Sequence, residues 1–295
     1  MSSPYVRRLR LGMEIRALRD ERGWTQARLA RLAGMTRNDL SKLENGQAVD
    51  LADALNLLDA LGIEGDRWTA LSAIARDAVT PGWWDSVKHI GVRQALYANL
   101  EYGATTIRQF QQVYLPGLLQ LPDYIRSLYA AEEAFGPVAV PIEDSLAGRA
   151  GRQRNLRLPG GPTLEIVMDE LAILRRAAPA EVTRPQLRHL ATIAQGVQPN
   201  VTLRVLPTEG ELRDYAVART PFSVYTYPDA GDPTVVAIDT ETSDVIMTRP
   251  ADVARYEWLY ERLHEAALSP EDSAKLLAKA ADMLPETCGM SPGLA

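Results

Sequence analysis

The sequence predicts an α+β fold: an all-α domain of five helices, then an α+β domain with a small, mainly antiparallel sheet flanked by helices. Apolar positions recur at helical spacing through residues 1–80. β-branched and aromatic runs, separated by Pro, Asp and Gly, gather between residues 163 and 248. Helical spacing then returns beyond residue 250. The length of 295 residues allows two such domains.

Glycines and capping residues divide the N-terminal part into five helices. Gly23 ends the first helix, and Thr25 and Thr36 are good N-caps for the second and the third. The predicted helices span residues 5–22, 26–33, 36–45, 50–61 and 65–78. The breaker Pro81-Gly82 follows, so the first domain is predicted to cover residues 1–80.

Beyond this breaker the pattern mixes helices and strands. Residues 83–130 read as helical segments interrupted by prolines. Further helices are predicted at residues 142–158, 184–196, 251–267 and 270–283, and strands at 163–168, 200–206, 221–227, 234–239 and 245–248. The last four strands are typical of an antiparallel meander. The second domain is thus predicted to span residues 81–284, followed by a flexible tail at 285–295.

Composition argues against several classes of protein. No stretch approaches the roughly 18 apolar residues that a transmembrane helix needs, and the arginine-bearing N-terminus lacks the apolar region of a secretory signal. Cys288 is the single cysteine, so an intrachain disulfide and a thiolate metal cage are excluded. We therefore expect a cytoplasmic protein without a metal or a cofactor.

Charge is distributed unevenly along the chain. Residues 1–45 hold ten Arg/Lys against five Asp/Glu, a net charge of +5, so the other 250 residues carry −11 to reach the total of −6. A basic head on an acidic body is typical of a small module that contacts a polyanion. An arginine-rich face that is merely solvated is the alternative.

Residues 25–46, TQARLARLAGMTRNDLSKLENG, form the strongest motif. Two short helices joined by a tight corner can share one small core. Five apolar side chains are predicted to point into it: Leu29, Ala30, Met35, Leu40 and Leu43. A small side chain at Ala30 lets the helices approach, and Gly34 suits a corner that needs positive φ.

The opposite face of the third helix is polar. Arg37 can bind a guanine bidentately, Asn38 an adenine, and Gln26 can reach a phosphate from the start of the second helix. The predicted DNA-contacting residues are Thr25, Gln26, Thr36, Arg37, Asn38, Ser41, Lys42 and Asn45. Five packed helices with a solvated basic face are the alternative.

Over residues 7–62 the sequence resembles the lambda-repressor/Cro-like (XRE) helix-turn-helix family. The residues that carry the resemblance are Leu18, Arg19, Gly23, Trp24, Thr25, Gln26, Leu29, Ala30, Gly34, Leu40, Ser41, Lys42, Glu44, Asn45 and Gly46. The resemblance implies DNA contacts at Gln26, Arg37, Asn38 and Lys42, and a charge pair between Arg19 and Glu44. Several relatives have Ser or Gln where this chain has Arg37-Asn38, so their operator sequences do not transfer.

Residues 83–284 resemble the uncharacterised C-terminal domain that follows such a helix-turn-helix in many actinobacterial regulators. The matching blocks are Gly82-Trp83-Trp84, residues 114–120 (YLPGLLQ), Asp123-Tyr124, Arg149, Arg152-Gln153, Asp169-Glu170, Leu187, Leu190, residues 199–201 (PNV), residues 205–207 (VLP), Pro221-Phe222, Tyr256 and residues 268–270 (LSP). The resemblance implies a domain that senses a ligand or a partner protein. Members are often encoded beside a small protein.

The ligand-binding residues of this domain are unknown. Tyr114, Leu118, Tyr124 and Arg152 are the candidates. The first three flank a Pro-Gly break and line either a cleft or a plain core, and Arg152 either binds an anion or is solvated. Trp83 and Trp84 are either a binding platform or an interdomain packing patch.

Catalysis finds little support in the sequence. The three histidines are far apart without metal-ligand spacing, and no GxSxG, P-loop or GxGxxG motif occurs. Asp169-Glu170 is either an acid pair or a helix cap. We therefore expect a homodimeric transcription regulator, not an enzyme, that binds a palindromic double-stranded DNA operator and responds to a small-molecule effector or a protein. The alternative is an antitoxin-like autoregulator whose C-terminal domain sequesters a small partner protein.

Overall fold

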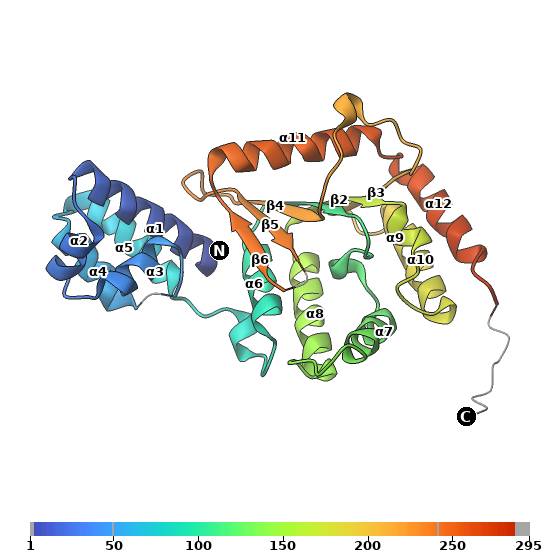
Figure 1. Ribbon diagram of the computed structural model, residues 1–295, viewed down its shortest axis with the longest axis horizontal. Coiled ribbons are helices and arrows are strands. Elements are labelled where there is room, and N and C mark those ends of the chain that lie inside the picture. The colour runs from blue at the N-terminus through green and yellow to red at the C-terminus, as the bar shows by residue number, and fades with distance from the viewer. Residues whose placement is uncertain (1–2, 49, 241, 287–295) are drawn as a thin grey trace.

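The computed structural model describes residues 3–48, 50–240 and 242–286, and opens with five helices (Figure 1). They are α1 (Pro4–Glu21), α2 (Gln26–Leu32), α3 (Arg37–Glu44), α4 (Leu51–Ala60) and α5 (Gly65–Ala78). The predicted N-terminal helical region is therefore confirmed.

Side chains cap four of these helices. The Ser3, Thr25, Thr36 and Asp50 side chains each accept a hydrogen bond from a backbone N–H in the following turn. The helices then enclose a single apolar core built from every one of them. Its fully buried members include Leu11, Ile15, Leu18, Leu29, Leu40, Leu57 and Leu58.

A six-stranded sheet organises the rest of the chain. Its strands are β1 (Thr106–Gln111), β2 (Thr163–Asp169), β3 (Val201–Leu206), β4 (Phe222–Thr226), β5 (Val235–Asp239) and β6 (Asp244–Met247). Their order is β3-β2-β1-β4-β5-β6. Strands β1, β2 and β3 run parallel, whereas β4, β5 and β6 form an antiparallel meander that joins the sheet at β1.

The expectation of a mainly antiparallel sheet is therefore wrong, because the sheet is mixed. Strand β1 was missed within the stretch assigned to helices, and its sequence TIRQFQ reads as polar although it lies at the centre of the sheet. The parallel pair β2–β3 needs a crossover, which α10 (Ala180–Ala194) supplies. This helix begins four residues before the predicted start, with Pro185 inside it.

Helices cover both faces of the sheet (Figure 1). One face packs against α11 (Pro250–Ala266), and the other against α6 (Val92–Glu101), α8 (Ile142–Arg157), α10 and α12 (Pro270–Asp282). The remaining elements are α7 (Pro122–Glu133), the one-turn α9 (Leu171–Leu174) and the 3-10 turns η1 (Trp83–Ser86), η2 (Gly117–Leu119) and η3 (Arg213–Tyr215).

Helix α1 contributes to both cores. Its first turns contact α6, where Ser3 Oγ donates to Asn99 Oδ1 at 3.0 Å. Val6 is fully buried with side chains of the sheet and its covering helices, from α6 to α12, which we call the sheet domain. The later turns of α1 pack on α3 and α5. The predicted domain limits at residues 80 and 284 stay predictions, and residues 287–295 of the predicted flexible tail lie outside the described residues.

Among the described residues, no helix combines the length and the apolar character that crossing a membrane requires.

Candidate nucleic-acid interface

Helices α2 and α3 meet at a corner whose inner side chains are buried. Leu40 is fully buried and Leu43 is 3% exposed, while Ala30 lies at the contact between the two helices. Gly34 has φ of 70° in this corner, and Met35 N donates to Ala30 O at 2.9 Å. The corner therefore needs a left-handed backbone conformation at this position, which glycine adopts without steric cost.

Burial of Leu40 and Leu43 turns the opposite face of α3 to solvent. Arg37, Asn38 and Lys42 are all exposed, and Ser41 is half-buried beside them. Lys42 Nζ lies 3.7 Å from Asp39 Oδ1, and both side chains are about half exposed. Because such exposed pairs are weak, Lys42 remains available to a stronger anionic partner. The predicted arrangement of three polar side chains beside a buried leucine pair is present.

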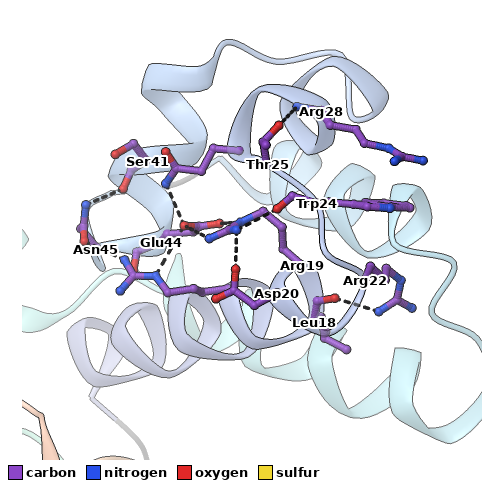
Figure 2. Close-up of polar contacts among 12 residues, drawn as sticks. Leu18, Arg19, Asp20, Arg22, Trp24, Thr25, Arg28, Ser41, Glu44 and Asn45 are labelled. Carbon is purple, nitrogen blue, oxygen red and sulfur yellow. Dashed lines mark hydrogen bonds and ion pairs between the residues drawn. The ribbon is translucent and has the colours of Figure 1, made fainter.

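A buried charge pair fastens α1 to α3 (Figure 2). Arg19 Nε and Nη2 donate to the two oxygens of Glu44 at 2.6 and 3.1 Å, and the Glu44 side chain is fully buried. Burial alone would raise the pKa of this carboxyl, but the hydrogen bonds from Arg19 and Gln26 outweigh it and lower the pKa. The predicted pair of Arg19 and Glu44 is thus present in the structure.

Besides Lys42, four of the predicted contact residues have side-chain hydrogen-bond partners within the protein. Gln26 Nε2 donates to Glu44 Oε2 at 2.8 Å, so this amide faces the charge pair. Thr25 and Thr36 use their hydroxyl oxygens as N-caps. Asn45 Nδ2 donates to Ser41 O at 2.8 Å (Figure 2). DNA contacts from these four residues stay predictions, and they require either a second hydrogen bond or a rearrangement.

Arg16 is a further residue of this interface, and its role was not predicted from the sequence. Its Nη2 donates to Asn45 Oδ1 at 2.9 Å and to the Glu44 carbonyl oxygen at 3.1 Å, and its side chain is 46% exposed. The guanidinium of Arg16, which projects from α1, therefore lies at the C-terminal end of α3, beside the charge pair. Its position three residues before Arg19, on the same face of α1, is the signal that could have identified it.

The candidate ligand residues of the sheet domain do not form a cleft. Leu118 and Tyr124 are buried in the core, whereas Tyr114 is 52% exposed. Arg152 pairs with Glu101, with Nε 2.9 Å from Oε2. The loop that carries Leu118 is held by side-chain hydrogen bonds from Arg149 and Gln186 to its carbonyl oxygens. The plain-core alternative therefore describes this segment better.

Contacts bear on two other pairs of predicted alternatives, and those of Trp83 and Trp84 lie within the predicted second domain and not between the domains. Trp83 and Trp84 pack within a small cluster with Ile90 and Ala98, and Trp83 lies against Gly151 of α8. Asp169 Oδ1 accepts a hydrogen bond from Leu171 N at 2.9 Å, and Glu170 Oε2 accepts from Thr208. Asp169 thus accepts the first backbone N–H of α9, and Glu170, the N-cap residue, makes no side-chain cap hydrogen bond and holds a loop instead. Within the described residues, no group of three or more His, Cys, Asp or Glu is arranged to hold a metal ion.

The N-terminal helices define a class of protein. The family model described as "Helix-turn-helix domain" matches residues 10–71, which include the whole corner and its charge pair. The chain therefore carries the DNA-binding domain of a helix-turn-helix regulator.

The larger part identifies the family. The model described as "Domain of unknown function (DUF5753)" matches residues 94–279, more than half of the chain, so the protein belongs to this family. No curated protein and no solved structure matches the chain.

Proposed function

We propose that this protein is a sequence-specific transcription regulator of the XRE, Cro-like type, with α3 entering the major groove of double-stranded DNA. The observation that carries the proposal is the corner of α2 and α3, which buries Leu40 and Leu43 and leaves Arg37, Asn38 and Lys42 exposed. In this orientation the guanidinium of Arg37 can donate two hydrogen bonds to a guanine, and the amide of Asn38 can pair with an adenine.

The regulator acts as a cytoplasmic homodimer on a palindromic operator. Single modules of this size contact few base pairs, so two copies on half-sites about 34 Å apart supply the specificity. Its activity is binding, without catalysis and without a cofactor, and most non-specific affinity comes from phosphate contacts that weaken with salt.

The sheet domain senses an effector and transmits its binding through α1. Support comes from the contacts of this helix with the loop between β4 and β5. Arg10 Nη1 lies 2.8 Å from Asp229 Oδ2, and Arg7 Nη1 lies 3.2 Å from Asp232 Oδ1. Since α1 also holds α3 through Arg19 and Glu44, a shift of this loop would change the position of α3 relative to the sheet domain.

A small partner protein is the second candidate for what the sheet domain recognises. Phe135 and Tyr215 are almost fully exposed, at 96% and 93%, and Val217 is 67% exposed. Tyr215 and Asp214 also have positive φ, a conformation that non-glycine residues adopt at a cost. A small protein that purifies with the chain in stoichiometric amount would favour an autoregulator that sequesters this partner.

Selection of bound duplexes from a random pool tests the DNA-binding proposal. We expect one palindromic site, and an Arg37→Ala variant should lose about 1–3 kcal/mol on it and accept other bases at one position of each half-site. Arg67→Ala, on the exposed surface of α5, is the matched control and should behave as the unaltered protein. A pool that returns no preferred sequence, or equal effects of both substitutions, would contradict the assignment.

A further inference from the structure

A polar groove of about 330 Å³ lies between α11 and the three parallel strands. Arg108, Glu165 and Arg204 line it from the sheet, and Tyr260, Glu261 and His264 line it from the helix. None of these residues belongs to the DNA-binding helices.

The groove interrupts an otherwise apolar contact. Two residues after Arg108, Glu165 and Arg204, the same face of the sheet carries three apolar side chains that are buried under α11. They are Phe110, Val167 and Leu206. Side chains at alternate positions of a strand share a face, so the charged residues continue the row that this core begins. Charged groups are costly next to a core unless they are paired, and their pairing here is incomplete.

One end of the groove has an excess of negative charge. Arg108 Nε lies 3.0 Å from Glu165 Oε2, and Arg108 Nη1 lies 2.9 Å from Glu261 Oε1. A single guanidinium therefore serves two carboxylates, and both carboxylates are partly exposed to the groove.

The other end has an unmatched positive charge. Arg204 Nη1 donates to the Leu268 carbonyl oxygen at 3.3 Å, and its Nε is buried without a hydrogen-bond partner. Among the described residues no carboxylate lies within ion-pair distance of Arg204. A guanidinium has five N–H donors that match the geometry of a carboxylate, and most of these donors are unused here.

His264 adds a neutral group between the two ends. Its ring stacks on Tyr260 with centroids 6.0 Å apart. Burial, followed by the charge of Arg204, lowers the pKa of this imidazole, so it is uncharged at neutral pH. The groove therefore has opposite charges at its ends and no net excess of either sign.

We propose that this groove binds a small zwitterion that carries a carboxylate and an amine, with the carboxylate on Arg204 and the ammonium group facing Glu165 and Glu261. Glu165 pairs in register with Thr202, two residues before Arg204 on the next strand. Strands about 4.8 Å apart and a rise of about 3.3 Å per residue place the Cα atoms of Glu165 and Arg204 roughly 8 Å apart. A zwitterion whose two charges are separated by several ångströms fits this distance better than a zwitterion whose charges are adjacent.

Titration calorimetry on the full chain with three matched probes tests the proposal. The probe 6-aminohexanoate carries both charges, hexanoate has only the carboxylate, and hexylamine has only the amine. We expect 6-aminohexanoate to bind with 1:1 stoichiometry. Hexanoate and hexylamine should each bind with an affinity lower by a factor of about ten or more. Glu261→Gln should narrow the difference in affinity between 6-aminohexanoate and hexanoate, because it removes one of the two carboxylates that face the ammonium group.

Arg204→Gln should abolish binding of both carboxylate probes. Arg255 is an exposed residue of α11 that does not line the groove, and Arg255→Gln should leave binding unchanged. Equal affinities for all three probes would overturn the proposal, and so would binding of 6-aminohexanoate retained in Arg204→Gln. Failure of the folded, unaltered protein to bind 6-aminohexanoate or to change its melting temperature in its presence would overturn it as well. The site rests on contacts within the sheet domain, so its failure would leave the DNA-binding proposal intact, which the selection experiment tests separately.

Discussion

Glu44 is a carboxylate without solvent contact, and its stability as a charged group depends on Arg19. The guanidinium donates two hydrogen bonds to it, and the Gln26 amide adds a third. A buried ion pair contributes little compared with an apolar pair of the same volume, but removing one partner leaves an uncompensated charge in the interior. At this position the pair therefore specifies how α1 and α3 pack.

Arg19→Leu should lower the free energy of unfolding of the helix-turn-helix domain by about 3 kcal/mol, because Glu44 would lose its bidentate partner and stay buried with only the Gln26 amide and Arg16 Nε, at 3.5 Å, beside it. Arg19→Leu combined with Glu44→Leu should recover most of this loss. Urea unfolding followed by circular dichroism measures both. Arg67→Leu serves as the exposed control, and a double variant no more stable than the single one would show that the pair is not the cause.

Residue roles were only partly predictable. The exposed positions of Arg37, Asn38 and Lys42 follow from helical spacing once Leu40 and Leu43 are taken as buried. The contacts of Gln26 and Arg16 with the charge pair depend on how α1, α2 and α3 cross, which spacing within one helix does not contain.

At the scale of elements, the corner depends on Leu40. This side chain is fully buried between the helices of the N-terminal core. A buried carboxylate without a partner costs several kcal/mol, so the corner cannot accommodate an acid there.

Leu40→Asp should abolish DNA binding and remove the folded signal of the first domain, whereas Leu40→Met should retain both, because its volume is nearly the same. Thermal unfolding by circular dichroism and a mobility-shift measurement on the selected site provide the readouts. A Leu40→Asp protein with an unchanged melting temperature would show that this position is not part of the core.

The sheet shows where element prediction ends. Its last four strands were predicted as an antiparallel meander. Strands β4, β5 and β6 form one, whereas β3 pairs parallel with β2, so the prediction is wrong for β3. Strand β1 was missed because Arg108 faces the polar groove and the next residue, Gln109, is polar although it is buried, so the apolar alternation of a central strand is absent. Since β1 joins the parallel and antiparallel halves, missing it also hid the mixed topology.

At the scale of the whole molecule, α1 links the DNA-binding helices to the sheet domain. Its arginines meet Asp229 and Asp232 in the loop between β4 and β5, and Val6 is buried in the sheet-domain core. The two parts should therefore unfold together as long as these contacts persist.

This coupling should weaken in acid. The backbone N–H of Gly231, then Arg10 and Arg7, lower the pKa of Asp229 to about 2. A depressed pKa contributes stability that is complete above the unfolded-state value near 4 and is lost as the pH falls toward 2. Scanning calorimetry should show one transition at neutral pH and two separate transitions near pH 2.

Asp229→Asn is the matched variant for this prediction. It removes the charge at every pH, so its two transitions should already separate at neutral pH. Lowering the pH should then increase the gap between the two melting temperatures by less than in the unaltered protein. A variant that keeps a single transition at neutral pH would show that the loop contact does not couple the two parts.

The sequence by itself determined the five N-terminal helices, the caps Thr25 and Thr36, and the buried and exposed faces of α2 and α3, because these follow from local spacing and from single residues with strong backbone preferences. Only the tertiary structure decided the place of β1 in the sheet, the contacts of α1 with a loop more than 200 residues away, and the unequal pairing of Arg108 and Arg204. Such features depend on which distant segments share a surface, and strand pairing and ion pairing across elements leave no periodic signal in the chain.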